Sequence, residues 1–508
     1  MNDIVPGPAH GCPMPHTPIP RSYCPSELVL CDASTLATRI HRREISCVDV
    51  MQAYLRHIAA VNPAVNALIE LRNNEELLKE AQARDDMLAA GHDMGWLHGI
   101  PVAIKDLSDA AGLPTSKGSP LFAGQIAQGD TAFVTRMKNA GAIVIGKSNT
   151  PEFGLGSHTY NPVHGVTRNA YDIRLSAGGS SGGAAVALAM RLLPIADGSD
   201  MMGSLRNPAA FNNVLGFRPS FGIVPHAPAT ELYISQLSTA GPMARTVPDL
   251  ARLLAIQAGN DPRDPLCAAG EPNRFLNPLG RDLSGLRIGW LGDMESNLPY
   301  QSGIDSLCQQ ALAHFETFGA LVEETQVEFS FARLWRTWLT LRHWLVGNSL
   351  HALYHHPAKR AQLKPEAVWE IEGGRKLDGR AVYEAWEARS QWFVAIEKLF
   401  ERFDVLALPS AQAFPFDAAM SWPSAISGVG MDTYHRWMNV VVPGTLYGGP
   451  VISVPIGFNT NGLPMGMQLI GRYRHDFELL QVAHAFERST RWSERLPPML
   501  DLEPLSEP

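Results

Sequence analysis

Positive charge is not concentrated anywhere in this sequence. Its 508 residues include 42 Lys and Arg against 50 Asp and Glu, which gives a formal net charge of −8. Proteins that bind nucleic acid use clustered basic residues to neutralise the phosphate backbone. No such cluster occurs here, so we do not expect a nucleic-acid partner.

Cysteine is scarce, and its spacing excludes several kinds of site. No two of the six cysteines form the Cys-x-x-Cys pair of zinc ribbons and thioredoxin-like redox sites. The 17 histidines contain no His-Glu-x-x-His motif, so we predict neither a metal nor a cofactor. Whether any cysteines pair stays open, because four of them fall in the first 47 residues: Cys12, Cys24, Cys31 and Cys47.

Long apolar segments are also missing. The sequence has no run of about 18 apolar residues of the kind that crosses a membrane. The first 20 residues lack the basic region and the apolar region of a secretory signal. We therefore expect a cytoplasmic protein without membrane attachment.

Short apolar segments instead alternate with helical patterns. This alternation predicts an α/β protein whose mixed, twisted central sheet is covered by helices on both faces. Functional residues of such a fold lie where strands end. Strands are expected at residues 100–104, 142–145, 405–408, 451–455 and 465–470. Helices are expected at residues 34–42 (capped by Asp32), 74–90, 131–140, 184–193 and 476–487.

Composition divides the chain into regions. Residues 1–30, rich in proline towards the start, predict an extended N-terminal arm, and residues 31–508 predict one α/β/α domain. Within that domain, residues 290–440 show mainly helical patterns, and eight of the eleven tryptophans fall between Trp335 and Trp437. We expect this region to add a variable helical layer that sets substrate specificity.

Residues 178–183 read Gly-Gly-Ser-Ser-Gly-Gly. Such a sequence lets the backbone approach another group closely, and the N-terminus of the helix expected after it stabilises negative charge. A flexible turn has the same composition. A phosphate-binding Walker loop would end in Gly-Lys-Ser/Thr rather than Gly-Gly-Ala. A nucleophile elbow would follow a buried strand, whereas residues 169–176 are too polar for one.

Two further segments accompany this serine-glycine loop. Residues 99–106 read Gly-Ile-Pro-Val-Ala-Ile-Lys-Asp, and residues 200–208 read Asp-Met-Met-Gly-Ser-Leu-Arg-Asn-Pro. In this order and spacing, the three segments resemble the amidase signature family, whose members carry G-[IV]-P-x-x-x-K-[DE], G-G-S-S-G-G and G-[TS]-D-x-G-G-S-x-R-x-P. The resemblance covers most of the chain and includes residues 146–153, 216–220, 241–246 and 462–468.

The resemblance implies a hydrolase of amide (C–N) bonds that works through an acyl-serine intermediate. Ser204 corresponds to the nucleophile, Ser180 to the serine that bridges nucleophile and base by hydrogen bonds, and Lys105 to the base. A lysine accepts a proton only when it is neutral, and burial at a strand end lowers its pKa towards that condition. The alternative is a charged Lys105 that pairs with Asp106 or another acid. Lys147, which also ends an expected strand, is interpreted as non-catalytic.

The family also places an oxyanion hole in the turn before the nucleophile. Its backbone N–H groups would come from Met201, Met202, Gly203 and Ser204. Met202 stands where the family commonly has glycine, and a methionine would be strained if that position required positive φ. We hypothesise that Met201 or Met202 narrows or reshapes the site.

Three neighbouring residues are expected to support this machinery. Asp200 and Arg206 flank the nucleophile and predict an ion pair that holds the turn. Ser181 either orients Lys105 or caps the helix that follows, and we favour capping.

The expected substrate is a small amide, anilide, ester or carbamate. One alternative is the amide-cleaving subunit of an amidotransferase, which passes ammonia to a partner. Another is a catalytically silent protein that keeps the scaffold, although the presence of all three catalytic residue types argues against it. A homodimer is a further expectation.

Overall fold

The computed structural model describes residues 17–20, 23–268 and 270–500. An eight-stranded sheet runs through the centre in the order β10-β9-β11-β15-β14-β7-β8-β6. Strand β9 pairs in parallel with β10 and β11, and the other pairings are antiparallel. The strands are β6 (Ile195–Asp200), β7 (Leu215–Arg218), β8 (Thr239–Ala244), β9 (Arg287–Trp290), β10 (Leu321–Glu324), β11 (Val405–Pro409), β14 (Val451–Phe458) and β15 (Pro464–Gly471). The predicted mixed α/β fold is confirmed.

Helices lie on both faces of the central sheet. Successive residues of a strand point to opposite faces, so positions 466 and 471 of β15 face opposite ways. A Cβ atom on Gly466 would lie 3.0 Å from Cβ of Ala210 in α7 (Arg206–Phe211). A Cβ atom on Gly471 would lie 3.1 Å from Cβ of Leu479 in α15 (Asp476–Thr490). Further helices that contact the sheet are α6 (Gly182–Ala189), α8 (Val247–Gln257) and α9 (Ile304–Glu316).

A second, smaller sheet holds the strand that carries Lys105. Its order is β1-β3-β2, formed by β1 (Leu68–Ile69), β2 (Pro101–Lys105) and β3 (Ile143–Ser148). Strands β2 and β3 were expected from their apolar residues, but they pair in parallel with each other and do not join the central sheet. Every residue of β2 is buried, which places its last residue in the interior.

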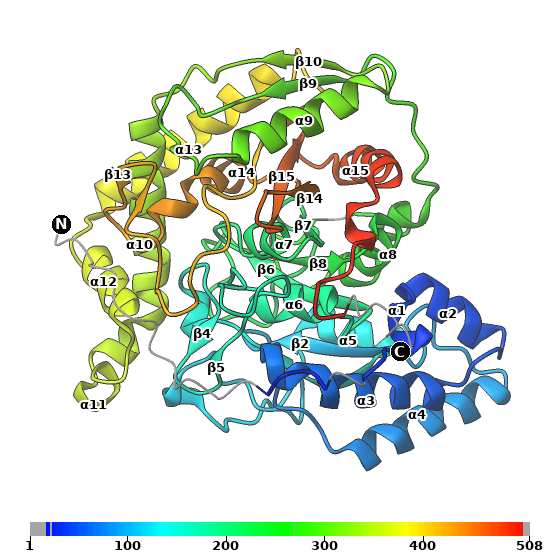
Figure 1. Cartoon of the computed structure of the whole chain (residues 1–508). Helices are drawn as coiled ribbons and strands as arrows, with labels where there is room; N and C mark the ends of the chain where they lie inside the picture. Colours follow the sequence, from blue (N-terminus) through cyan, green and yellow to red (C-terminus); the bar gives the residue numbers. More distant parts are fainter. Residues whose placement is uncertain (1–16, 21–22, 269, 501–508) are drawn as a thin grey trace.

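The N-terminal helices pack on this smaller sheet and beside it (Figure 1). They are α2 (Ala33–His41), α3 (Cys47–Val65), α4 (Asn74–Ala89) and, later in the chain, α5 (Ala132–Asn139). Asp32 caps α2 as predicted, by accepting a hydrogen bond from the Thr35 N–H at 2.6 Å. Of the predicted arm, residues 1–16, 21 and 22 lie outside the described residues. Its end is not extended, because Glu27–Leu30 form α1 and bury Leu28 and Val29.

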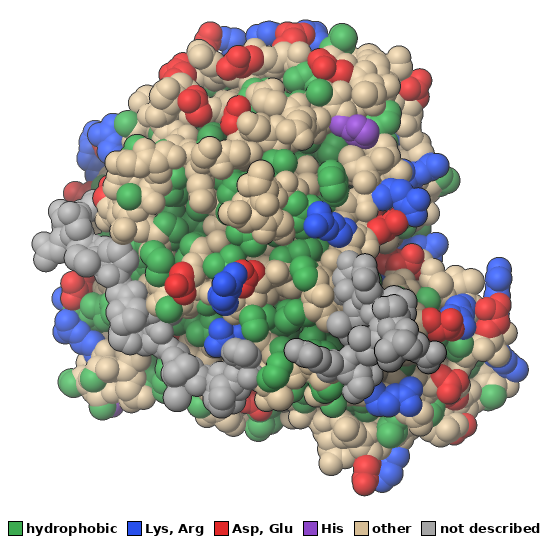
Figure 2. Space-filling model, in the orientation of Figure 1, with side chains coloured by type: hydrophobic (Ala, Val, Ile, Leu, Met, Phe, Trp, Pro, Cys, Tyr) green, Lys and Arg blue, Asp and Glu red, His purple; other side chains and the backbone are tan. Residues whose placement is uncertain are grey.

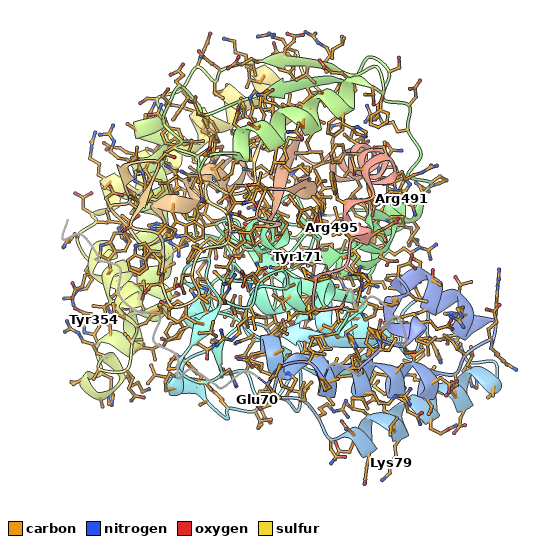
Figure 3. All side chains as sticks on the ribbon, viewed as in Figure 1. Glu70, Lys79, Tyr171, Tyr354, Arg491 and Arg495 are labelled. Carbon is orange, nitrogen blue, oxygen red and sulfur yellow. The ribbon has the colours of Figure 1, made fainter. Side chains whose placement is uncertain are left out.

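The tryptophan-rich region forms a helical layer, but it also extends the sheet. Its helices are α10 (Phe331–Tyr354), α11 (Pro357–Arg360), α12 (Pro365–Gly374) and α13 (Gly379–Leu399), and Tyr354 marks the end of α10 at the left of Figure 3. Strands β10 and β11, from the same region, pair with β9 at one edge of the central sheet. The same region therefore contributes both the helical layer and two strands of the central sheet.

The remaining short elements lie in connections. They are α14 (Val442–Tyr447), β4 (Tyr160–Asn161), β5 (Gly165–Val166), β12 (Ala425–Ile426) and β13 (Val429–Gly430). Figure 2 shows Lys and Arg interspersed with Asp and Glu over one face of the molecule. None of the helices in the described part of the chain combines the length and the apolar character needed to cross a bilayer.

Five cysteines fall in described positions, and each has a free thiol. They are Cys24, Cys31, Cys47, Cys267 and Cys308. Cys12 lies outside the described residues.

We predict that Gly216→Ala destabilises the protein. A Cβ atom at this position in β7 would lie 2.1 Å from the carbonyl oxygen of Leu205, which is backbone and cannot rotate away. Overpacking of this kind costs about 1–3 kcal/mol or more, so the midpoint of thermal unfolding should fall. Gly280→Ala is the matched control, because a Cβ atom there meets nothing within 4 Å. Equal midpoints for the two variants would contradict the packing described here.

Candidate active site

Lys105 ends β2 with its side chain fully buried among hydroxyl groups. Its Nζ atom lies 2.8 Å from Ser180 Oγ, 2.8 Å from Ser181 Oγ and 3.1 Å from Ser199 Oγ. It forms no ion pair with any carboxylate in the part of the chain that the structure describes. An amine in this setting has hydrogen-bond partners but no direct countercharge.

Burial lowers the pKa of Lys105 to about 7, even though the negative charges of Asp197 and Asp200 act in the opposite direction. Removal from water disfavours the ammonium form, which is the physical cause of the shift. The carboxylate of Asp197 accepts the backbone N–H of Lys105 at 3.1 Å, and burial raises the pKa of Asp197 to about 6. A large fraction of Lys105 is therefore neutral near pH 7.

Asp106 does not form an ion pair with Lys105, so the structure does not show the alternative in which a charged Lys105 pairs with this carboxylate. Asp106 instead lies 3.9 Å from Lys147 Nζ and accepts a hydrogen bond from the Ser116 hydroxyl. Lys147 Nζ also donates to the Ser108 carbonyl oxygen at 2.5 Å. Among the described residues, Lys147 forms no hydrogen bond to Ser180, Ser181 or Ser204, which agrees with its interpretation as non-catalytic.

The serine-glycine loop lies at the start of α6 and against the end of β3. A Cβ atom on Gly183 would lie 2.3 Å from the backbone nitrogen of Asn149, so this close approach requires glycine. Ser181 occupies the N-cap position, but its side chain makes no capping hydrogen bond, and the prediction that it caps α6 is wrong. Its hydroxyl lies next to Lys105 and Ser199 instead, because the buried amine competes for it.

The turn that carries Ser204 is built around the buried carboxylate of Asp200. Arg206 donates to both of its oxygens, from Nε and Nη2, at 2.9 Å each, so the predicted ion pair is present. Burial alone would raise the pKa of Asp200, but the charges of Arg206 and Arg218 hold this pKa at about 2. Asp200 also accepts the N–H of Gly203 at 2.7 Å. The carboxylate thus fixes both ends of the turn.

Ser204 lines a cavity of about 380 Å³ together with Ser180 and Ser199. Within the described residues, the Ser204 hydroxyl forms no hydrogen bond, so the expected bond between Ser180 and Ser204 is not made. Catalytic hydrogen bonds are often long without substrate and tighten when it binds. The structure therefore brings Lys105 to Ser180, and brings Ser180 and Ser204 to one cavity.

Three residues of the turn, Met201, Met202 and Ser204, line the same cavity. The N–H groups of Met201, Met202 and Ser204 donate no hydrogen bond to any described residue. That of Gly203 is already donated to Asp200. Gly203 has φ of 79°, whereas Met202 is not among the residues with positive φ, so the expected strain at Met202 is absent. Both methionine side chains line the cavity.

Several residues of this site carried no signal in the sequence. Asp197 and Ser199 belong to β6, which was not predicted because Ile195–Asp200 contains only two apolar side chains. Arg342 lines the cavity from α10, more than a hundred residues away along the chain. Strand β6 pairs with β8 and lies against β2, and the contact with β2 brings the first two residues beside Lys105.

Comparison with known proteins decides the family. A family model described as Amidase matches residues 49–480. The acylamidase of Rhodococcus erythropolis is 31% identical over 472 residues, covering 92% of this chain and 96% of that protein. The chain belongs to the amidase signature family.

Solved structures agree with this assignment. A bacterial aryl acylamidase of the amidase signature family superposes with a TM-score of 0.86 at 27% identity, covering 94% of this chain and all of that one. The peptide amidase of Stenotrophomonas maltophilia gives 0.75 at 30% identity, covering 95% and 100%. The amidase signature protein described here is accordingly an amide hydrolase.

A relative of another role shares the same scaffold. A glutamyl-tRNA(Gln) amidotransferase subunit of Methylococcus capsulatus is 34% identical over 487 residues, covering 91% of this chain and 97% of that protein. Membership of the amidase signature family therefore includes both free-standing amidases and an amidotransferase subunit.

Arg206→Met should strongly destabilise this amidase. The substitution leaves the buried carboxylate of Asp200 without its bidentate partner, which costs about 3–5 kcal/mol. Arg174→Met is the matched control, because Arg174 pairs with Asp172 at 2.7 Å but is 84% exposed. We expect urea unfolding to show a large loss for the first variant and no measurable change for the second. A small effect of Arg206→Met would contradict the structural role of the pair.

Proposed function

We propose that this chain hydrolyses small amides through an acyl-enzyme on Ser204. The observation that carries the proposal is a buried lysine without a countercharge, in contact with a serine that shares a cavity with Ser204. Serine attacks a carbonyl carbon only as its proton is removed, and a neutral amine can take up that proton. The amidase signature family, shown for this chain, has the same three residue types in the same motifs.

The first step moves one proton along two hydroxyls. Ser204 Oγ attacks the carbonyl carbon while its proton passes to Ser180 Oγ, and the Ser180 proton passes to Lys105 Nζ, which becomes an ammonium. The tetrahedral intermediate carries one negative charge on the former carbonyl oxygen. The free N–H groups of Met201, Met202 and Ser204 support an oxyanion site for that charge. Gly203 would contribute only if its bond to Asp200 opened.

The second step returns the proton to the leaving group. The Lys105 ammonium gives a proton back through Ser180 to the amide nitrogen, the C–N bond breaks, and the amine leaves. Water then attacks acyl-Ser204 by the same route, which releases the carboxylic acid and restores the neutral lysine. Ser181 and Ser199 hold the amine in place through both steps.

The substrate is proposed to be a small amide, anilide, ester or carbamate. A cavity of about 380 Å³ is within the range of small-molecule sites. The relative that belongs to an amidotransferase keeps the alternative role open, and release of ammonia or amine by the isolated chain would exclude that role. A homodimer and a cytoplasmic location stay predictions.

Labelling by a fluorophosphonate tests the nucleophile. We expect the Ser204 oxygen to displace fluoride and the adduct to map to Ser204 by mass spectrometry. Ser204→Ala should lose labelling and more than about a thousandfold of its activity towards an anilide, while Ser238→Ala, another serine that lines the cavity, should keep both. An adduct on a different serine, or an active Ser204→Ala enzyme, would refute the assignment.

The pH profile tests the base. Because the neutral amine is the reactive form and the pKa of Lys105 is about 7, kcat/KM should rise about tenfold per pH unit below pH 6 and level off above about pH 8. Asp197→Asn should move the inflection to lower pH, since the Asp197 charge stabilises the ammonium. A profile that is flat between pH 6 and 9, or an inflection that vanishes in Asp197→Asn, would exclude Lys105 as the base.

A further inference from the structure

Arg342 places a buried guanidinium in the wall of the proposed acyl cavity. The residue lies in α10 and is 4% exposed. None of the proposed proton-transfer steps uses it. A buried charge is costly unless hydrogen bonds and opposite charges replace the water it has lost. The partners of Arg342 therefore show which of its nitrogens are already bound.

Two nitrogens of Arg342 are bound by Glu370 and Tyr434. Its Nε atom donates to Glu370 Oε1 at 2.6 Å, and its Nη2 atom donates to the Tyr434 hydroxyl at 2.5 Å. Glu370 Oε2 in turn lies 2.8 Å from Nδ1 of His343. Burial alone would lower the pKa of Arg342, but Tyr434 and Glu370 raise it above its ordinary value. The guanidinium therefore stays charged at every pH at which the enzyme is folded.

The remaining nitrogen, Nη1, lacks a strong acceptor. Its only described hydrogen-bond partner is the thioether sulfur of Met201, at 3.3 Å. Sulfur of this kind is a weak acceptor, whereas an arginine N–H bonds best to carboxylate oxygen. Nη1 thus belongs to a residue of the cavity wall, and no described oxygen acceptor uses its donor capacity.

Charge on the cavity wall has one sign. Lys117 and Arg342 both line the cavity, and the described lining residues include no Asp or Glu. Lys117 stacks over the Phe122 ring and has no ion pair among the described residues. Most of the other wall is apolar or carries serine hydroxyls. The charged side chains that line the cavity can therefore contact an anionic group directly, and none of them can pair with a cationic one.

We propose that Nη1 of Arg342 binds a carboxylate of the substrate, so that the preferred substrates are amides carrying an acid group close to the scissile bond. This inference rests on the proposed function and names its substrate class. Arg342 and Ser204 line the same cavity, and Met201, whose sulfur lies 3.3 Å from Nη1, is three residues from Ser204 along the chain. A carboxylate bound at Nη1 and a carbonyl group at Ser204 therefore share a cavity of about 380 Å³, which keeps the acid group near the scissile bond.

Matched substrate pairs test the proposal on the unmodified enzyme. On the acyl side, succinyl para-nitroanilide is compared with levulinyl para-nitroanilide, which replaces the carboxylate by a methyl ketone of similar size. On the amine side, pentanoyl para-aminobenzoate is compared with pentanoyl para-aminoacetophenone. We expect kcat/KM to favour the acid by roughly tenfold or more in at least one pair, mainly through a lower KM, because a charged hydrogen bond is stronger than a neutral one.

Variants then assign the preference to Arg342. Arg342→Gln alone would leave the buried carboxylate of Glu370 without its positively charged partner. This substitution is therefore combined with Glu370→Gln. The double variant should process the neutral substrates within a few-fold of the parent and lose the preference for the acid. Glu370→Gln alone keeps the guanidinium and should keep or increase the preference. A merely structural role of Arg342 would lower kcat/KM equally for acid and neutral substrates.

Two results would overturn the proposed role of Arg342. Equal kcat/KM within both pairs for the parent enzyme overturns the proposal, even if no variant folds. A preference that survives in the folded double variant also overturns it. Labelling of Ser204 by a fluorophosphonate separates the two levels: labelled enzyme without acid preference refutes only this inference, and unlabelled enzyme refutes the proposed function itself.

Discussion

The burial of one amine governs the rest of this site. Lys105 is delivered by a five-residue strand whose every position is buried, and its Nζ atom meets three serine hydroxyls but no carboxylate at contact distance among the described residues. Water would hold a lysine as ammonium, with a pKa of about 10.4. Desolvation lowers the pKa of Lys105, and the negative charges of Asp197 and Asp200 limit how far this pKa falls. This balance yields an amine that can take up a proton near neutral pH.

The acidic residues near Lys105 are each held by other groups. Asp200 is bound by Arg206 and by the N–H of Gly203, which also shapes the turn of Ser204. Asp106 lies beside Lys147, and Asp197 accepts a backbone N–H rather than the amine of Lys105. Had any of these carboxylates paired directly with Nζ, the ammonium form would be stabilised and proton uptake suppressed. The proposed role of Lys105 therefore depends on the arrangement of the neighbouring charges as much as on the presence of the lysine and the serines.

The sequence was sufficient where local patterns determine structure. Strand β2, the cap of α2 by Asp32 and the ion pair between Asp200 and Arg206 were all predicted. It failed where tertiary contacts decide. The polar strand β6 is recognisable only by its pairing with β8, Ser181 exchanges a local cap for a buried lysine distant in sequence, and Arg342 reaches the cavity from a remote helix. The smaller sheet of β1, β2 and β3 was likewise invisible to periodicity.

The central claim is that the Lys105 amine loses its proton near neutral pH in the folded enzyme. The most direct measurement is an NMR titration of the side-chain Cε and Nζ of Lys105, assigned by comparison with a Lys105→Arg protein. The account predicts a titration midpoint at about 7. A midpoint close to the ordinary lysine value of about 10.4 would show that the amine is charged at neutral pH and would contradict this account.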